Sequence, residues 1–224
     1  MTEKEHTYLD LVQKRKSFRF GELLNPSEIE GGRYDDDHVE LWARWMGNLN
    51  ATILLVGKDF GGSEFFLRFG GRCDPNSVTN KNLIKLFACI GIDIGSPKKP
   101  NTEAPVFFTN AIVGIINSHS KGKNRISSKS IMESAVEFLR PLIDIIGPKI
   151  IIAMGKEAYE CVSITCGLPR FRSMAQSLNI SPLRAGDSRL LFPVFHCGGL
   201  GVANRSLTKH QEDWKRIKAY LLVS

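Results

Sequence analysis

Several kinds of feature are absent from this sequence, and each absence argues against a class of protein. No stretch approaches the roughly 18 consecutive apolar residues that a membrane-spanning helix needs. The charged start of the chain has no apolar signal core behind it. The five cysteines form no C-x-x-C pair, which argues against zinc ribbons and dithiol redox sites. We therefore expect a soluble, intracellular protein with reduced thiols, which is not secreted and has no membrane partner.

Acidic residues are also in short supply. The chain has 23 Asp and Glu against 30 Lys and Arg, so its formal net charge is +7. A basic surplus attracts polyanions, nucleic acid first among them. An ordinary solubility charge is the alternative, and composition does not decide between the two. The length of 224 residues and a hydrophobic content of 42% suit one domain with a full core.

Short apolar runs alternate with helical patterns along most of the chain. Four runs are typical of buried strands, at 53–56, 106–109, 149–154 and 191–195. Apolar residues at helical spacing predict helices at 82–90, 130–146, 155–166 and 206–222. This order is typical of a parallel sheet covered on both faces. We expect an α/β fold, a three-layer α/β/α sandwich around a mostly parallel four-stranded sheet, as one domain over residues 1–224.

The first 50 residues are less regular. A basic, partly apolar segment at 9–20 predicts a helix. The acidic run at 35–37 predicts the start of a second helix, because negative charge is favourable at a helix N-terminus. The same run together with His38 offers a metal site as a weaker alternative, and we expect neither a metal nor another cofactor. We interpret residues 1–50 as a helical cap on the same domain.

Polar side chains follow three of the four predicted strands. Asp59 comes after the first strand within a glycine-rich turn, Asn110 ends the second, and His196 follows the fourth. Ligands of open α/β sheets bind beyond the carboxyl ends of the strands, so these residues are expected to converge at one edge. Singly, an Asp after a strand is often a helix cap and a lone His is often packed. Three at corresponding strand ends favour a functional site.

Segments in chain order resemble those of the uracil-DNA glycosylase superfamily. The segment Val56-Gly57-Lys58-Asp59-Phe60-Gly61 resembles the family's first motif, G-Q-D-P-Y-H, and His196-Cys197-Gly198-Gly199-Leu200 resembles the second, H-P-S-P-L. Three further segments, at 108–111, 148–158 and 203–205, are similar to the family's central strand, its P-K-v-i-v-a-L-G-x-x-A segment and the A-N-K of its single-strand-selective branch. The resemblance runs from about Thr52 to Lys218, most of the chain.

This resemblance implies a uracil-DNA glycosylase-like fold and a function in base-excision repair. The enzyme would be a monofunctional DNA glycosylase that hydrolyses the N-glycosidic bond of uracil or a related deaminated or damaged base. The enzyme would bind DNA and act as a monomer. It would be found in the cytoplasm, associated with the nucleoid, or in the nucleus.

The resemblance also assigns roles by position. Asp59 falls on the residue that activates or orients the attacking water. His196 falls on the donor to O2 of the leaving base, and a preorganised donor of this kind is commonly worth ~3 kcal/mol. Asn110 falls on the residue that reads the base edge, since an amide supplies a donor and an acceptor. Gly57 and Lys58 border the base.

Further roles concern the DNA strand and the flipped base. Leu200 falls on the residue that wedges into the base stack when a nucleotide is extruded. Phe69 is the first candidate for the ring that stacks on the flipped base, with Phe65 or Phe66 as alternatives. Glycines permit close approach of backbone N–H groups to phosphate. Gly198 and Gly199 are expected to contact a phosphate, and Arg205 is expected to bind DNA. The basic loop that carries Lys121, Lys123 and Arg125 follows the Asn110 strand, and it either holds DNA phosphates or is an ordinary solvated loop.

The sequence departs from the family pattern in informative places. Phe60 replaces a proline, and Gly61 stands where strict uracil enzymes carry a tyrosine that excludes the thymine methyl. Gly61 is therefore the expected specificity residue, and it leaves space for larger bases. The segment Cys197-Gly198-Gly199 replaces P-S-P. The N-terminal cysteine pair of the iron–sulfur branch is absent, so we expect no cluster.

Other interpretations remain open at this point. The lost prolines of the second motif motivate a non-catalytic binder of damaged or single-stranded nucleic acid on the same fold. A thiol enzyme that uses Cys197 beside His196 is disfavoured, because neighbours at a strand end point to opposite sides. A phosphate-binding loop at 57–62 is weak, because the spacings that cradle phosphate are missing.

Overall fold

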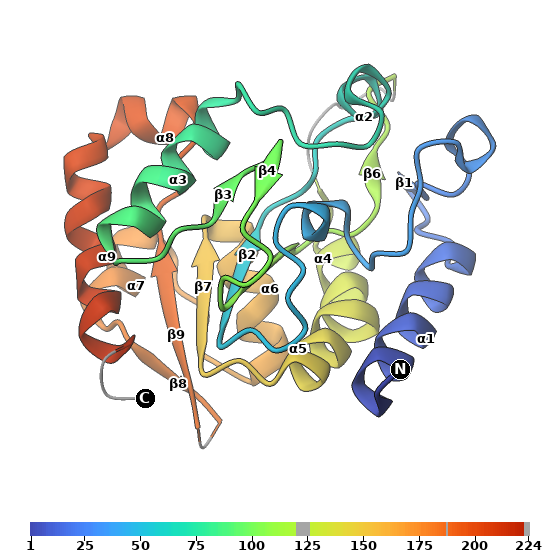
Figure 1. Cartoon of the computed structure of the whole chain (residues 1–224). Helices are drawn as coiled ribbons and strands as arrows, with labels where there is room; N and C mark the ends of the chain where they lie inside the picture. Colours follow the sequence, from blue (N-terminus) through green and yellow to red (C-terminus); the bar gives the residue numbers. More distant parts are fainter. Residues whose placement is uncertain (120–125, 187, 222–224) are drawn as a thin grey trace.

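The centre of the fold is a five-stranded sheet (Figure 1). The computed structural model describes residues 1–119, 126–186 and 188–221. The strand order is β5-β2-β7-β9-β8, and all neighbours are parallel except β8, which is antiparallel to β9. The strands are β2 (Ile53–Gly57), β5 (Val106–Asn110), β7 (Ile150–Met154), β8 (Leu183–Ala185) and β9 (Arg189–Val194).

The four predicted strands are confirmed, but the expected four-stranded sheet was one strand short. The missed strand, β8, has three residues and lies at the edge beside β9. Its sequence Leu183-Arg184-Ala185 has no apolar run, because only one of its residues is buried. Its pairing with β9 is a tertiary contact that periodicity does not reveal.

Helices and short turns make up most of the remaining structure. The described α-helices are α1 (Glu3–Ser17), α2 (Ser63–Phe69), α3 (Val78–Cys89), α4 (Ser128–Ser134), α5 (Arg140–Ile146), α6 (Lys156–Cys166), α7 (Met174–Asn179), α8 (Gly199–Asn204) and α9 (Leu207–Leu221). A π-helical turn joins α4 to α5 at Ala135–Leu139. Two-residue strands pair as β1 (Leu23–Leu24) with β6 (Ile115–Ile116), and β3 (Gly95–Ser96) with β4 (Lys99–Pro100). In the described part of the chain, no helix combines the length and apolar character needed to cross a membrane.

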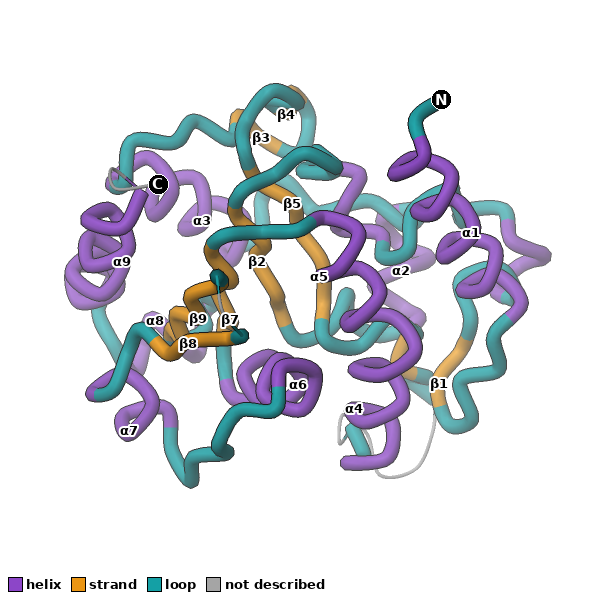
Figure 2. Tube along the Cα trace, turned by 90° about the horizontal axis from the view of Figure 1, so that it is seen from below, coloured by secondary structure: helices purple, strands orange, loops and turns teal. Residues whose placement is uncertain are grey.

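Helices cover both faces of the sheet (Figure 2). Successive strand residues point to opposite faces, so Leu54 and Ile151 pack with α1, α4, α5 and α6, whereas Leu55 and Ile152 pack with α3 and α9. Every residue of β2, β5 and β7 is buried. Burial on both faces explains why these strands appear in the sequence as continuous apolar runs. The α/β architecture is confirmed.

The acidic run at 35–37 does not start a helix. Asp35 forms an ion pair with Arg15 of α1, with 2.6 Å between Oδ1 and Nη1, and Asp37 pairs with Lys16 of the same helix at 2.6 Å. The prediction of a helix N-terminus is wrong, because Asp35 and Asp37 pair with side chains of α1 that carry a full positive charge, and not with the partial charge of a helix end. The run instead holds α1 against the rest of the protein.

A short 3-10 turn (Leu41–Arg44) replaces the second predicted helix. Glu40 caps this turn, because its Oε2 accepts a hydrogen bond from the backbone N–H of Trp42 (2.9 Å). Residues 1–50, all of which are described, contain one α-helix, two 3-10 turns and a two-residue strand. Buried residues of this segment pack into the clusters on both faces of the sheet, Leu11 on one and Trp45 on the other.

We predict that Arg15→Ala lowers the free energy of unfolding by about 3 kcal/mol or more, because a buried carboxylate loses its partner. Arg15 is 1% exposed and also donates to the backbone carbonyls of Asp36 and His38 (2.8 Å each). Chemical denaturation measures the change. Arg19, which is exposed, supplies the matched control: Arg19→Ala should stay within about 0.5 kcal/mol of the parent protein. Equal losses in both variants would contradict the assigned role.

Candidate functional site

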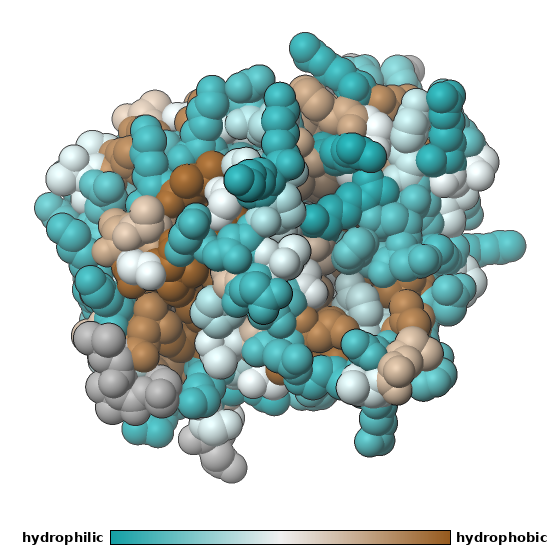
Figure 3. Space-filling view, viewed as in Figure 1, coloured by the Kyte–Doolittle hydropathy of each residue, from teal (hydrophilic) through white to brown (hydrophobic). Residues whose placement is uncertain are grey.

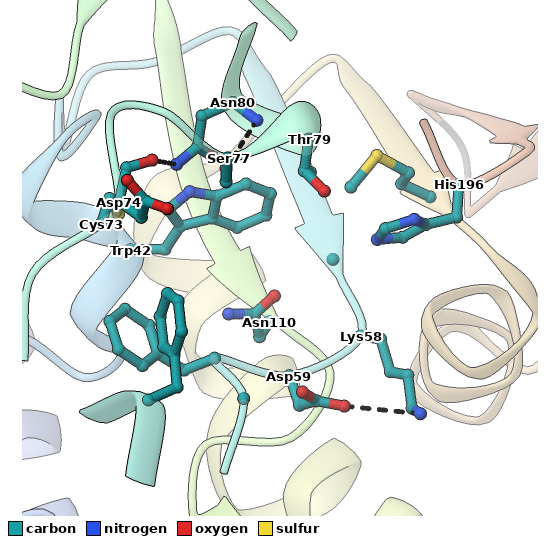
Figure 4. A pocket seen from close by; sticks show the side chains of 15 residues that line it. Trp42, Lys58, Asp59, Cys73, Asp74, Ser77, Thr79, Asn80, Asn110 and His196 are labelled. Atoms are coloured by element: carbon teal, nitrogen blue, oxygen red, sulfur yellow. Dashed lines mark hydrogen bonds and ion pairs between the residues drawn. The ribbon is translucent and has the colours of Figure 1, made fainter. Parts of the chain in front are cut away.

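A cavity of about 320 Å³ lies beyond the carboxyl ends of β2 and β5 (Figure 4). Asp59, Asn110 and His196 all line it, as their places at three strand ends predict. In the parallel ladder Gly57 is paired with Asn110. The predicted residues Gly57, Lys58 and Gly61 line it as well. Other lining residues were not predicted: Trp42, Phe60, Cys73, Asp74, Ser77, Thr79, Asn80 and Met154.

Gly57 makes room for two cavity side chains. A Cβ at this position would collide with Oδ1 of Asn110 and lie 2.6 Å from Cζ3 of Trp42. The Asn110 side chain, in a residue only 3% exposed, therefore reaches the cavity past a bare backbone. Figure 4 shows it between Trp42 and Asp59. Gly57 thus acts through the placement of Asn110 and Trp42.

Asp59 is a largely buried carboxylate beside a cation. Its side chain is 13% exposed, and the Lys58 Nζ lies 3.6 Å from its Oδ2. Burial raises the pKa of Asp59. The charge of Lys58 and the N–H of Gly61 act in the opposite direction, the charge of Glu157 raises the pKa further, and the net shift is upward. Lys58 also lies 3.8 Å from Oε1 of Glu157. Its ammonium therefore bridges two carboxylates at the cavity wall.

His196 is held as a neutral imidazole with a defined tautomer. The backbone N–H of Gly198 donates to Nδ1 of His196, with 3.0 Å between the nitrogens. A backbone amide can only donate, so Nδ1 carries no proton and the proton of the neutral ring resides on Nε2. Burial lowers the pKa of His196, against the opposing charges of Asp59 and Glu157. The site therefore contains a hydrogen-bond donor that carries no net charge.

The expected phosphate contact of Gly198 is not available to a ligand, because its N–H is already bonded to His196. A Cβ on Gly198 would lie 2.7 Å from Cε1 of His196 and 2.9 Å from Oγ1 of Thr79, so only glycine fits here. Gly199 is exposed, and its Cβ direction is open. Gly201 packs directly on the carbonyl of His196. The glycines of this segment thus position the imidazole.

Leu200 lies in the first turn of α8 and Arg205 directly follows this helix, and their side chains differ in exposure and in partners. Leu200 is 85% exposed, as expected of a residue that would enter a base stack. Arg205 forms a two-pronged ion pair with Asp213 (2.8 and 2.9 Å), and its guanidinium lies 5.2 Å from the centroid of the Phe195 ring. Arg205, which is expected to bind DNA, is thus paired with Asp213, and this ion pair links the end of α8 to α9.

Phe69, the first candidate for stacking on a base, does not line this cavity. It ends α2 and lines a separate cavity with Tyr34. Phe66 is fully buried in the core. Phe65, the other alternative, does line the cavity, together with Phe60. Phe60 lies between β2 and α2 and Phe65 lies on α2, and their ring centroids are 5.8 Å apart.

Gly61 adopts a conformation that side chains disfavour, with φ of 113°. The direction of its missing Cβ points at Phe65, whose Cδ1 would be 3.4 Å away. The space expected to be open at Gly61 is therefore bordered by the Phe65 ring. Any size selection on this side of the cavity depends on both residues.

Glu40 is a functional candidate that the sequence did not indicate. It is 3% exposed, and burial raises its pKa to about 7, while the Asn110 amide and the Trp42 N–H favour its charged form. Among the described residues, its Oε1 has no partner in full hydrogen-bond geometry. A carboxyl group behind the amide of Asn110 biases how that amide is turned. No periodicity or motif distinguishes this glutamate from a surface one.

The loop before α3 forms a further wall that was not predicted. Ser77 caps α3 by accepting from the Asn80 N–H (3.1 Å), and the Asn80 amide donates to the carbonyl of Asp74 (2.8 Å). The amide of Asn82 donates to the carbonyl of Cys197 (2.8 Å), which ties α3 to the segment that carries His196. A capping serine is visible in the sequence, but it does not by itself point to a ligand.

Cys197 faces away from the cavity. It is fully buried, its Sγ lies 3.5 Å from Sδ of Met154, and burial raises the pKa of its thiol to about 12. A protonated, inaccessible thiol is not a nucleophile, so the thiol-enzyme hypothesis loses its reactive group. Within residues 1–119, 126–186 and 188–221, no group of three or more His, Cys, Asp and Glu is arranged to hold a metal ion.

Three predicted phosphate contacts, Lys121, Lys123 and Arg125, lie outside the described residues.

Comparison with models of known protein families finds no family that matches this chain, and comparison with curated proteins finds no similar sequence.

We predict that Gly198→Ala removes the tautomer preference of His196. The added Cβ would push the imidazole away from the backbone N–H of residue 198, which donates to Nδ1 in the parent protein. Nitrogen-15 NMR of the imidazole measures the tautomer: the parent protein should show the proton on Nε2 at neutral pH. Gly199→Ala is the matched control and should leave the spectrum unchanged, since its Cβ meets nothing within 4 Å. An unaltered tautomer in Gly198→Ala would refute the proposed lock.

Proposed function

We propose that this protein is a DNA glycosylase that hydrolyses the N-glycosidic bond between deoxyribose and uracil or a related deaminated base. One observation carries the proposal: a single cavity brings together the Asp59 carboxylate, the Asn110 amide and a neutral His196 imidazole. The rings of Trp42 and Phe65 supply flat apolar walls. This combination suits a planar heterocycle that carries both donors and acceptors.

The chemistry follows from what each group can do. As the bond from C1′ to N1 breaks, its electron pair leaves with the base, and O2 of the base gains negative charge. The Nε2–H of His196 donates to that oxygen, and a neutral donor serves because the developing charge is delocalised. Asp59 stabilises the sugar cation, orients a water towards C1′ and accepts its proton. The products are the free base and an abasic sugar.

Recognition of the base is assigned to Asn110 and the aromatic walls. The amide matches the N3–H and O4 of uracil, because it has one acceptor and one donor to offer. Phe65 lies against Gly61 and meets the substituent side of the base in this arrangement, so Phe65 and Gly61 together set the tolerated size. Uracil and related deaminated bases are the proposed range.

Access to the base requires that the nucleotide leave the stack. The side chain of Leu200, almost fully exposed at the start of α8, is suited to fill the vacated space. The excess of basic residues favours binding to the phosphate backbone. Because the cavity lies at the same edge of the sheet as α8, both roles can act on one nucleotide.

A protein that binds nucleic acid without turnover is the alternative. The lost prolines of the second motif motivate it, but the imidazole they would have positioned is held here by the Gly198 N–H. That bond supports a catalytic site. Base release in a single-turnover reaction, measured against binding of the same uracil oligonucleotide, separates the two proposals.

We predict that Asp59→Asn reduces single-turnover release of uracil at least about 100-fold, since an amide can neither accept the water proton nor stabilise a cation. Asp74→Asn is the matched control in the same cavity. Among the described residues, the Asp74 carboxylate accepts one hydrogen bond, from the Asn76 N–H to Oδ1 (2.8 Å), and an asparagine can accept it as well. Chromatography of the free base measures both variants. Full release by Asp59→Asn would overturn the mechanism.

The pH dependence of base release provides a second test. Activity needs Asp59 ionised and His196 neutral, so the rate should fall on acidification, at a midpoint above the usual carboxylate range because the pKa of Asp59 is raised. Lys58→Met removes a charge that lowers the pKa of both groups and should move the midpoint to higher pH. Glu157→Gln removes a charge that raises both and should move it to lower pH.

These opposite shifts are measured in single-turnover reactions at saturating enzyme, so that weaker binding does not distort them. Shifts in the same direction, or none in either variant, would contradict the assignment of the acid limb to Asp59 and His196.

A further inference from the structure

A second cavity, of about 440 Å³, lies beside the first. Cys73 lines both cavities, so they share a wall. The second lies between the end of α2 and the turn that joins β3 to β4, which contribute Phe69 and Pro97. In Figure 3, which has the view of Figure 1, hydrophilic and hydrophobic atoms lie side by side on the surface near α2.

Arginines dominate the polar lining of this second cavity, and none of its lining residues in the described part of the chain carries a carboxylate. Arg44 is committed to the protein: it pairs with Asp36 and donates to the carbonyls of Tyr34 (2.9 Å) and Gly71 (3.0 Å). Arg33 and Arg72 are exposed. Neither guanidinium has an ion pair or hydrogen bond within the described part of the chain, although that of Arg33 lies 5.3 Å from the centroid of the Tyr34 ring.

Aromatic rings connect the two cavities. Phe65 lines the first cavity and Phe69 the second, and their ring centroids are 4.7 Å apart. Phe69 and Tyr34 are both partly exposed. A row of accessible rings next to free guanidinium groups is the arrangement by which proteins bind single-stranded nucleic acid, since bases stack on the rings while cations neutralise phosphates.

We propose that the second cavity binds the nucleotide next to the extruded one on the same strand. Arg33 and Arg72 hold its phosphate, and its base stacks on Phe69. The inference rests on the proposed function, because that function places the neighbouring nucleotide in the first cavity. A small free anion could bind Arg33 and Arg72, but it would not contact the rings of Phe65 and Phe69, which connect the two cavities.

The test is a binding series with oligonucleotides of increasing length. Each carries one 2′-fluorinated deoxyuridine, because the fluorine disfavours the sugar cation and prevents base release during the measurement. Nucleotides are added one at a time to the 5′ or the 3′ side of the target. We expect the affinity of the parent protein to rise about ten-fold when the first nucleotides are added on one side, because each adds a base that stacks and a phosphate that pairs with arginine.

The variant Arg33→Gln/Arg72→Gln should lose this one-sided gain. Its salt dependence should also become shallower by about 0.7 in logarithmic slope for each phosphate that the protein no longer neutralises. Single-turnover base release from the unfluorinated oligonucleotide at saturating enzyme should be unchanged, because neither arginine lines the first cavity. Phe69→Leu tests the ring separately and should reduce the gain without changing the salt slope.

The matched control is Arg184→Gln/Lys215→Gln, which removes the same charge from exposed positions on β8 and α9. A one-sided gain retained by Arg33→Gln/Arg72→Gln, or abolished equally in the control, overturns the second site. Base release without a one-sided gain overturns the second site and leaves the proposed function standing. A one-sided gain without base release overturns the proposed function and leaves the second site standing. Absence of any binding overturns the second site and the proposed function together.

Discussion

The parallel register between β2 and β5 determines where the site can form. It pairs Gly57 with Asn110, so the first turn after β2 and the last side chain of β5 meet at one edge of the sheet. The backbone continues this pairing beyond the strands, where the N–H of Ala111 donates to the carbonyl of Gly57 (2.8 Å) and that of Ile112 to Lys58 (3.0 Å). A slip of one residue would turn every side chain of a strand to the other face. Because both faces of these strands are buried, such a slip would also disrupt two cores, and the register is correspondingly secure.

Burial then decides the electrostatics of this edge. The same desolvation raises the pKa of Asp59 and lowers that of His196, so burial favours the uncharged form of both groups, which share one cavity. Lys58 and Glu157 adjust both values from the rim. Glu40 extends the pattern behind Asn110, as a carboxyl whose charge depends on burial and on the amide next to it. A low-dielectric cavity makes each of these interactions stronger than it would be in water.

The sequence predicts most of the sheet and the polar end of each main strand, because both depend on local patterns. Strands buried on two faces appear as continuous apolar runs, and Asp59, Asn110 and His196 follow from their places after such runs. Elements set by distant partners were missed or misassigned. β8 exists because β9 offers an edge, and the run at 35–37 pairs with α1 because Arg15 and Lys16 come within reach. Trp42 reaches the cavity from residues 1–50, and Glu40 from the same segment contacts the Asn110 amide; no pattern in the sequence predicts either position.

The order of amino acids thus specifies the chemical groups and their succession along the strands. Which of these groups remain free to act depends on how the chain packs. The N–H of Gly198 is hydrogen-bonded to His196, and the guanidinium of Arg205 is paired with Asp213. Phe69 lines the neighbouring cavity, whereas Leu200 stays exposed. A donor or a charge acts through its nearest partner, and partners that are far apart in the chain come together only when the chain packs.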